Sequence, residues 1–249
     1  MPKVTNSTFS PGDGVAAVDR ALAIVIALET AAKPMTLAEL AAATGLYKST
    51  LLRLLASLER NRLVVRAHDQ RYKLGPLAFR LGRAYEATHH VKEAVMPALE
   101  WLIEQGTESA SFFILHDSQT RLCLFRIDSN HATLDRVRVG DLLPLVGAPG
   151  KVLLTFQDGS PGPVRQSALL IASYGERDPQ CGAVSAPVFG PDGQLVGALS
   201  LSGPLDRFTR AAVKTMSGPL LQAAEMTTRA LGGTWPGVEQ KSKEPARAR

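Results

Sequence analysis

Residues 36–55 read TLAELAAATGLYKSTLLRLL, and this stretch decides the fold of the N-terminal third of the chain. Thr36 and Glu39 have the spacing of a capping box, in which each side chain satisfies a free backbone N–H at the start of a helix. Gly45 suits a tight turn. A longer helix, from about residue 47 to 61, begins with polar residues. A short helix, a glycine turn and a longer helix form the helix-turn-helix pattern.

The segments on either side extend this motif to a winged form. An apolar stripe predicts a helix over 15–29, formed by Val15, Val18, Leu22, Val25, Ile26 and Leu28. Apolar stretches at 63–66 and 71–74 flank a polar turn and predict a hairpin, the wing. In the longer helix, the apolar residues are expected in the core: Leu51, Leu52, Leu54, Leu55 and Leu58. We expect a disordered arm over 1–14 and a winged helix-turn-helix over 15–75.

Basic charge is concentrated in the same region. The net charge of the chain is +5, and residues 1–90 hold all of the excess, with 12 Lys and Arg against 7 Asp and Glu. It is densest between Gly45 and Gly75, where seven bases face two acids. Confined basic charge is the electrostatic footprint of phosphate binding. On its own, the charge is equally compatible with a solvated basic face.

The rest of the chain changes character. Periodicity over 77–106 predicts helix, broken near His89-His90 or at Pro97. Strands are expected at 111–116, 121–126, 133–139, 183–189 and 195–202, and helices at 151–156, 164–172 and 210–231. This mixture predicts an α+β domain. We assign a linker helix to 76–95, the second domain to 96–232 and a disordered tail to 233–249.

Composition excludes several classes. The chain is 45% hydrophobic and 20% charged, as in ordinary globular proteins. No apolar run approaches the roughly 18 residues of a membrane span, and the N-terminus lacks the apolar region of a signal peptide. Cys123 and Cys181 match no metal-binding spacing. We expect a cytoplasmic protein with no cofactor, metal or membrane partner.

Together these stretches resemble the IclR family of bacterial transcription regulators. The resemblance spans residues 18–232 and is carried by the order and spacing of VDRAL (18–22), AATGLYKSTLLRLL (42–55), YKLG (72–75), VGDLLPL (139–145), GK (150–151), APVF (186–189) and LSLSGP (199–204). It implies an N-terminal winged helix-turn-helix, a linker helix and a C-terminal GAF-like antiparallel-sheet effector domain. It also implies homodimers or tetramers on palindromic operators of double-stranded DNA.

The sequence departs from the family pattern in three places. Tyr47 stands at the start of the recognition helix, where proline is usual. The segment between Lys151 and Ala186 is shorter than usual, so the effector domain is expected to be shortened. Third, Pro149 replaces a residue with an N–H. Apart from these departures, Ala183 stands where only some members of the family have cysteine.

The start of the recognition helix is expected to enter the major groove. Its contact residues would be Tyr47, Lys48, Ser49, Thr50 and Arg53. The Arg53 fork can bind guanine O6 and N7, and Lys48 suits a phosphate. On the wing, His68, Gln70 and Arg71 could touch the DNA backbone or the minor groove. The alternatives are a surface salt bridge for Arg53 and plain solvent exposure for the wing residues.

The second domain has no recognisable catalytic constellation, so no enzyme activity is expected. By resemblance, a small organic acid, aliphatic or aromatic, would bind Ala148, Pro149, Gly150, Cys181, Ala183, Ser200 and Ser202. Backbone N–H groups at a helix start suit a carboxylate, but Pro149 cannot donate one. This loss and the small Ala183 favour a different or less polar effector. The alternatives are a simple turn at 148–150 and backbone capping by the two serines.

Three function classes follow from these residues. The first is a regulator, with repression favoured over activation, whose operator affinity is controlled by the effector. The second is a DNA-binding regulator whose C-terminal domain only oligomerises. The third, an enzyme with a DNA-binding appendage, requires an acid–base or nucleophile cluster in residues 100–230, and none stands out.

Overall fold

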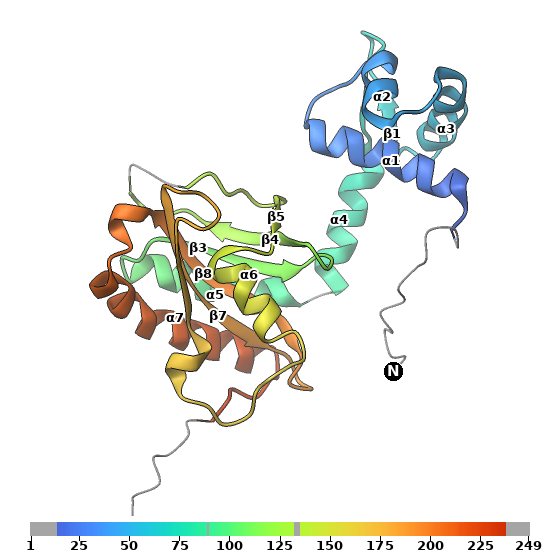
Figure 1. The fold of residues 1–249 in the computed structure, drawn as a ribbon. Helices are drawn as coiled ribbons and strands as arrows, with labels where there is room; N and C mark the ends of the chain where they lie inside the picture. Colours follow the sequence, from blue (N-terminus) through green and yellow to red (C-terminus); the bar gives the residue numbers. More distant parts are fainter. Residues whose placement is uncertain (1–13, 89, 132–134, 238–249) are drawn as a thin grey trace, which may run out of the picture. The chain divides into compact units, whose positions relative to one another are not determined.

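The structure is a computed structural model that describes residues 14–88, 90–131 and 135–237. The expected disordered arm, except Gly14, and the tail beyond residue 237 lie outside the described residues. The chain divides into two compact units, Met1–Thr88 and His89–Arg249 (Figure 1). Each unit has its own hydrophobic core.

The first unit is the predicted winged helix-turn-helix. Its elements are α1 (Ala16–Ala31), α2 (Leu37–Thr44), α3 (Lys48–Arg60), β1 (Val64–Arg66), β2 (Tyr72–Leu74) and α4 (Pro76–Thr88). The capping box at the start of α2 is present: the Thr36 N–H donates to Glu39 Oε2 at 2.6 Å, and the Glu39 N–H donates to Thr36 Oγ1 at 3.2 Å. Gly45 ends α2 with a φ of +68°, a left-handed conformation that favours glycine.

The core of this unit uses only part of the predicted apolar stripe. Its buried residues are Ile24, Leu28, Met35, Leu40, Leu51, Leu55, Val64 and Tyr72. The predicted helix is present, but of its apolar stripe Leu28 is buried whereas Val15, Val18, Leu22 and Ile26 are exposed. Leu52, expected in the core, is 49% exposed. A helix that packs on its neighbours through one face buries only residues one turn apart, here Ile24 and Leu28.

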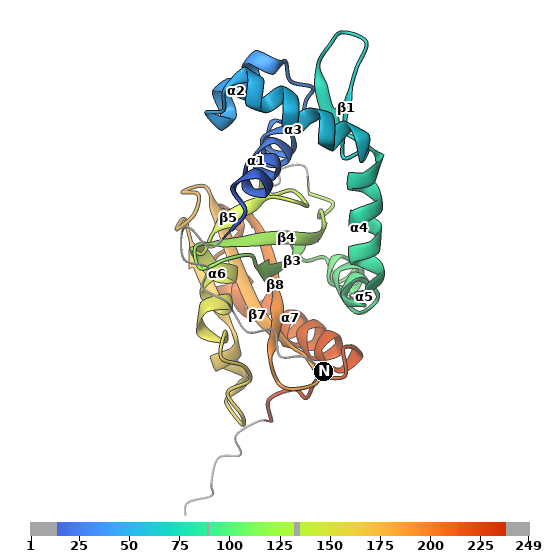
Figure 2. The same cartoon turned by 90° about the vertical axis from the view of Figure 1, so that its right-hand side faces the viewer.

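The second unit is built on one antiparallel sheet. Its elements are α5 (Val91–Glu104), β3 (Ser109–Leu115), β4 (Thr120–Ile127), β5 (Leu142–Pro144), α6 (Gly147–Thr155), η1 (Gln166–Leu169), β6 (Ile171–Tyr174), β7 (Cys181–Phe189), β8 (Leu195–Pro204), η2 (Leu205–Arg207) and α7 (Arg210–Ala230). The strand order is β5-β4-β3-β8-β7-β6. Helices α5 and α7 cover one face and α6 the other (Figure 2). The predicted α+β class is confirmed.

The register of the central strands sorts the residues of this sheet by polarity. Ser111 lies opposite Ser200, and Ser200 lies opposite Ser185. Ser202 lies between Ser109 and Ala183. Because strand side chains alternate between faces, these small polar residues share one face. The alternate positions carry the apolar side chains of the core: Ala110, Phe112, Val184, Ala186, Leu199 and Leu201.

Several predicted elements differ in the structure. The predicted helix over 164–172 is instead the short 3-10 helix η1 followed by strand β6. Residues 135–139, predicted as strand, are irregular. A short apolar run fits a strand or a buried helix equally well, so periodicity alone could not decide these segments.

The boundaries of the linker and of the tail also differ. Helix α4 ends at Thr88 and α5 begins at Val91, on either side of one of the two predicted places, and Pro97 lies inside α5. Residues 76–95 are therefore not one helix. Residues 233–237, assigned to the disordered tail, pack on the second unit: Trp235 is buried, and the Val164 N–H donates to the Gly237 carbonyl at 3.0 Å.

The close packing of β8 on β3 gives a testable prediction. A Cβ on Gly197 would lie 2.4 Å from Phe112 Cζ and 2.5 Å from the Phe113 carbonyl oxygen. We expect Gly197→Ala to lower the free energy of unfolding by about 1–3 kcal/mol, because the backbone cannot move away. In the matched control, Gly218→Ala in α7, the new Cβ meets nothing within 4 Å, and stability should rise by up to about 1 kcal/mol. Urea unfolding of the second unit measures both, and a Gly197→Ala protein as stable as the parent would contradict the packing.

Candidate functional site

The first candidate site is the start of α3. Tyr47 is the N-cap residue and is 85% exposed. Lys48, Ser49 and Arg53 are also exposed, and Thr50 is half-buried. Leu51 and Leu55 hold the opposite side of the helix in the core. The structure therefore brings the five predicted residues together on the outer side of one helix start, where the helix dipole adds positive potential.

The wing residues divide into two groups. His68 and Gln70 are exposed at the turn of the hairpin. Arg71 has intramolecular partners: its Nη1 lies 3.3 Å from Glu39 Oε2, and its Nε lies 3.6 Å from Asp69 Oδ2. The hydrogen bonds from Thr36, and to a smaller extent the charge of Arg71, lower the pKa of Glu39. Arg71 thus ties the wing to the start of α2, through exposed ion pairs of the kind that exchange readily.

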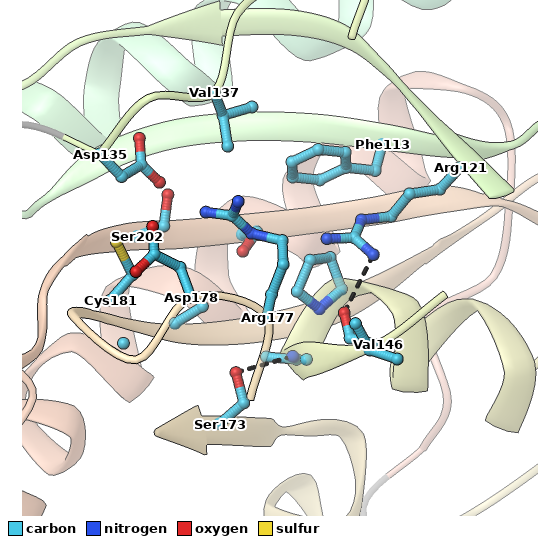
Figure 3. A pocket seen from close by; sticks show the side chains of 16 residues that line it. Phe113, Arg121, Asp135, Val137, Val146, Ser173, Arg177, Asp178, Cys181 and Ser202 are labelled. Atoms are coloured by element: carbon cyan, nitrogen blue, oxygen red, sulfur yellow. Dashed lines mark hydrogen bonds between the residues drawn. The ribbon is translucent and has the colours of Figure 1, made fainter. Parts of the chain in front are cut away.

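The second candidate site is a pocket between α6 and the polar face of the sheet (Figure 3). Six of the seven residues expected there line it: Ala148, Pro149, Cys181, Ala183, Ser200 and Ser202. Gly150 is not among the lining residues. A Cβ on Gly150 would lie 2.4 Å from the Leu145 carbonyl carbon, so this glycine allows the helix to approach the preceding loop. The space open to the centre of a water molecule is about 30 Å³.

Sequence reasoning missed the charged residues of the pocket, which are Arg121, Asp135, Arg177 and Asp178. These residues make the pocket charged, and the prediction of a different or less polar effector stays a prediction. Arg121 and Asp135 lie in segments that are predicted from the sequence only as strands. The spacing of Arg121 and Cys123 indicates that both side chains lie on the same face of the strand. It does not indicate which face of the strand lines a pocket.

Arg121 is the most unusual of these residues, because its side chain is buried and only 2% of the residue is exposed. Its Nη1 donates to the Pro144 carbonyl and, at 2.9 Å, to the Val146 carbonyl. Its guanidinium lies 5.1 Å from the centre of the Phe113 ring. Burial, and to a smaller extent the positive charge of Arg177, lower the pKa of Arg121 to about 10.

The acidic residues lie near the thiol of Cys181. Asp135 is buried, and its Oδ1 lies 2.5 Å from Arg126 Nη2, while its Oδ2 has no hydrogen-bond partner among the described residues. Asp178 accepts a hydrogen bond from the Gln180 N–H at 3.0 Å. Burial first, and then the charges of Asp178 and Asp135, raise the pKa of the Cys181 thiol. This thiol is consequently protonated and a weak nucleophile at neutral pH.

The start of α6 offers fewer free donors than expected. The Ala148 N–H donates to Ser173 Oγ at 2.8 Å, and Pro149 has no N–H. On the sheet, Ser185 Oγ and Ser200 Oγ are hydrogen-bonded at 2.8 Å, while the buried Ser202 Oγ has no partner among the described residues. The strongest hydrogen-bond donors in the pocket are therefore guanidinium groups, not the N–H groups of the helix start.

Within the described parts of the chain, no three His, Cys, Asp or Glu side chains are grouped to hold a metal ion. Histidine is also missing from the residues that line the pocket. In the same parts of the chain, no helix combines the length and the apolar character needed to cross a membrane.

Comparison with known proteins agrees with this architecture. Residues 17–68 match the IclR helix-turn-helix domain. The chain is 27% identical over 241 residues to the HTH-type transcriptional regulator BhcR of Paracoccus denitrificans, covering 85% of each chain. It is 22% identical over 228 residues to the HTH-type transcriptional regulator KipR of Bacillus subtilis, covering 80% of this chain and 91% of the relative.

Two solved structures are similar over most of their length. An IclR transcriptional regulator from Alicyclobacillus acidocaldarius has a TM-score of 0.72 at 22% identity, covering 88% of this chain and 100% of the other. An IclR homologue from Microbacterium hydrocarbonoxydans, in complex with 4-hydroxybenzoate, has a TM-score of 0.73 at 19% identity, covering 87% and 99%.

A winged helix-turn-helix followed by a separate α+β unit with a pocket defines a DNA-binding transcriptional regulator. The resemblance seen in the sequence is confirmed: residues 17–68 carry an IclR helix-turn-helix domain, and the similar curated proteins are transcriptional regulators.

Proposed function

We propose that this regulator binds a specific palindromic operator, acts as a repressor in the cytoplasm, and is controlled by a small organic acid or aromatic compound in the pocket of its second unit. The observation that carries the proposal is the buried guanidinium of Arg121, which faces a pocket and has only carbonyl groups and an aromatic ring as partners among the described residues. A buried cation without a carboxylate partner is costly, and an anionic ligand would offset that cost. The role is binding and not catalysis, since no nucleophile with an activating base lines the pocket.

Operator recognition is assigned to the start of α3. Tyr47, Lys48, Ser49 and Arg53 are exposed and follow one another on the outer side of the helix, with Thr50 half-buried beside them. Of these, Arg53 has the planar fork that reads guanine. His68, Gln70 and Arg71 on the wing would contact the DNA backbone, after Arg71 exchanges its exposed ion pairs for phosphate.

A charge-matched pair of variants tests this assignment. Arg53→Ala should weaken operator binding by about 1–3 kcal/mol and relax base preference at one position of each half-site. Arg60→Ala, which removes the same charge from the exposed C-terminal end of α3, should leave base preference unchanged. Fluorescence anisotropy with operator and random duplexes, at one fixed salt concentration, measures both. An equal loss on both duplexes would make Arg53 a phosphate contact.

We assign self-association to the outer face of α1. The exposed apolar residues follow a helical spacing, at 67%, 53%, 49% and 60% exposure for Val15, Val18, Leu22 and Ile26. Phe79 on α4 of the same unit is 73% exposed. A contiguous apolar stripe on a small domain is typical of a protein–protein contact, and a two-fold dimer matches the symmetry of a palindromic operator.

Leu22→Glu should therefore lower the oligomeric state of the protein, because it would bury a charge in the subunit interface. Light scattering coupled to size-exclusion chromatography measures the mass. The control is Leu154→Glu, at a leucine of α6 that is 42% exposed, and the mass of this variant should not change. If only the control variant loses mass, the self-association interface lies on the second unit and not on α1.

Effector control is tested with a variant that fills the pocket. Ala183→Leu should abolish the response to organic acids while operator binding persists, because the added atoms occupy the small free space. Ala168→Leu, on exposed η1, is the control. Thermal shift and operator anisotropy with a panel of aliphatic and aromatic acids give the readout. No shift with any acid would favour the alternative that the second unit only oligomerises.

A further inference from the structure

The charged groups of the pocket lie at two ends. Figure 3 shows Asp135, Asp178, Cys181 and Ser202 at one end and Arg121 at the other, with the Arg177 guanidinium between them. The electrostatic interactions agree with this view: both aspartates and Arg177 act on the Cys181 thiol, and Arg177 also acts on Arg121. The pocket therefore has two carboxylates at one end and a buried guanidinium at the other, with a second guanidinium between them.

The basic end is prepared for one carboxylate. Arg121 is held by the carbonyl groups of Pro144 and Val146, so its position is set before any ligand arrives. Its buried Nε has no partner among the described residues. In the same parts of the chain, no hydrogen bond or ion pair engages Arg177. Two guanidinium groups in one pocket, neither of them paired with a carboxylate among the described residues, favour an anion with planar oxygens.

The acidic end is prepared for a hydrogen-bond donor that carries positive charge. Asp135 has a side chain with no exposed surface, and its Oδ2 lacks a partner. Arg126 neutralises Asp135 through Oδ1. Asp178 has no such cationic partner within the described residues; it accepts a hydrogen bond from the Gln180 N–H and interacts with the Cys181 thiol. The Ser202 hydroxyl beside them is also buried and unpartnered.

We propose that the effector is a small zwitterion, an amino acid whose carboxylate binds Arg121 and Arg177 and whose ammonium group binds Asp135 and Asp178. This inference rests on the proposed function, because it takes the pocket as the effector site. The family resemblance leads only to an organic acid held by a helix start. The amino group is inferred from the two aspartates, and the guanidinium contacts from the loss of donors at Ala148 and Pro149.

The other acid classes fit this pocket less well. A plain carboxylate would leave Asp135 Oδ2 and Ser202 Oγ without partners, which is costly in a buried site. A dicarboxylate would bring its second negative charge against Asp135 and Asp178. The pocket is small, since the volume open to the centre of a water molecule is about 30 Å³. This size favours a compact amino acid over an aromatic acid.

The experiment uses acids that differ in one group. Alanine, lactate, propionate and methylmalonate share a methyl group and a carboxylate on one carbon, which carries an ammonium, hydroxyl, hydrogen or second carboxylate. β-Alanine and 3-hydroxypropionate form a longer pair. Isothermal titration of the full chain gives each affinity. We expect an amino acid to bind at least tenfold more tightly than its matched hydroxy acid and than propionate, and an equal or tighter fit for any acid without an ammonium group would overturn the proposal.

Two variants separate the ends of the pocket. Arg177→Gln should weaken binding of every acid, whereas Asp178→Asn should weaken only the amino acids, each by about tenfold. Arg210→Gln and Asp158→Asn, at exposed positions outside the pocket, are the matched controls. Asp178 is chosen over Asp135 because Asp135 forms an ion pair with the buried Arg126, and a substitution of Asp135 would destabilise the sheet. If Asp178→Asn loses affinity equally for lactate and alanine, the proposed contact between Asp178 and the ammonium group is wrong.

The outcomes also separate this inference from the proposed function. If propionate or methylmalonate binds best and changes operator affinity, the pocket is an effector site and the amino acid proposal is wrong. If no acid of any class binds the full chain, both are wrong. If an amino acid binds best and Ala183→Leu abolishes that binding, both are supported.

Discussion

The pairing of β3, β8 and β7 is the constraint on which the second unit depends. The ladder places Ser109, Ser111, Ser185, Ser200 and Ser202 on one face and a row of large apolar side chains on the other. Because the strand period is two, a slip of one residue would exchange the faces and bury the serines under α5 and α7. Gly197 secures this register, since no larger residue fits between β8 and the side chain of Phe112. The pocket is therefore a consequence of sheet packing, and the loops only complete it.

The placement of charge in the pocket compensates for what α6 lacks. With its Ala148 N–H taken by Ser173 and no N–H at Pro149, the start of the helix is a poor cradle for an anion. Arg121, which lies on strand β4, provides the anion-binding donors in place of the start of α6. Its position is fixed by two carbonyl groups and the ring of Phe113. A rigid, dehydrated guanidinium is a stronger and more directional donor than a backbone amide. Its burial is unfavourable without a ligand, which is the physical reason to expect binding to stabilise the unit.

In the first unit, too, the residues that form the core differ from the residues that are exposed to binding partners. Ile24 and Leu28 on α1, with Leu51 and Leu55 on α3, are sufficient to close the core. This leaves the start of α3 and the outer apolar stripe of α1 exposed. Arg71 illustrates how close the two roles are, since a residue expected on DNA also pairs with Glu39 of the capping box.

By itself, the sequence determined the elements whose signals are local. The capping box of Thr36 and Glu39, the turn at Gly45, the polar start of α3 and the concentration of basic charge all act within a few residues, and they led to the winged helix-turn-helix and its family. The strand spacing of Ser200 and Ser202 also indicated a shared face. Only the tertiary structure decided that β6 is a strand, that the stripe on α1 faces outward, and that Arg121, Asp135, Arg177 and Asp178 meet in one pocket. Those outcomes depend on contacts between segments far apart in the chain, and neither periodicity nor spacing carries that information.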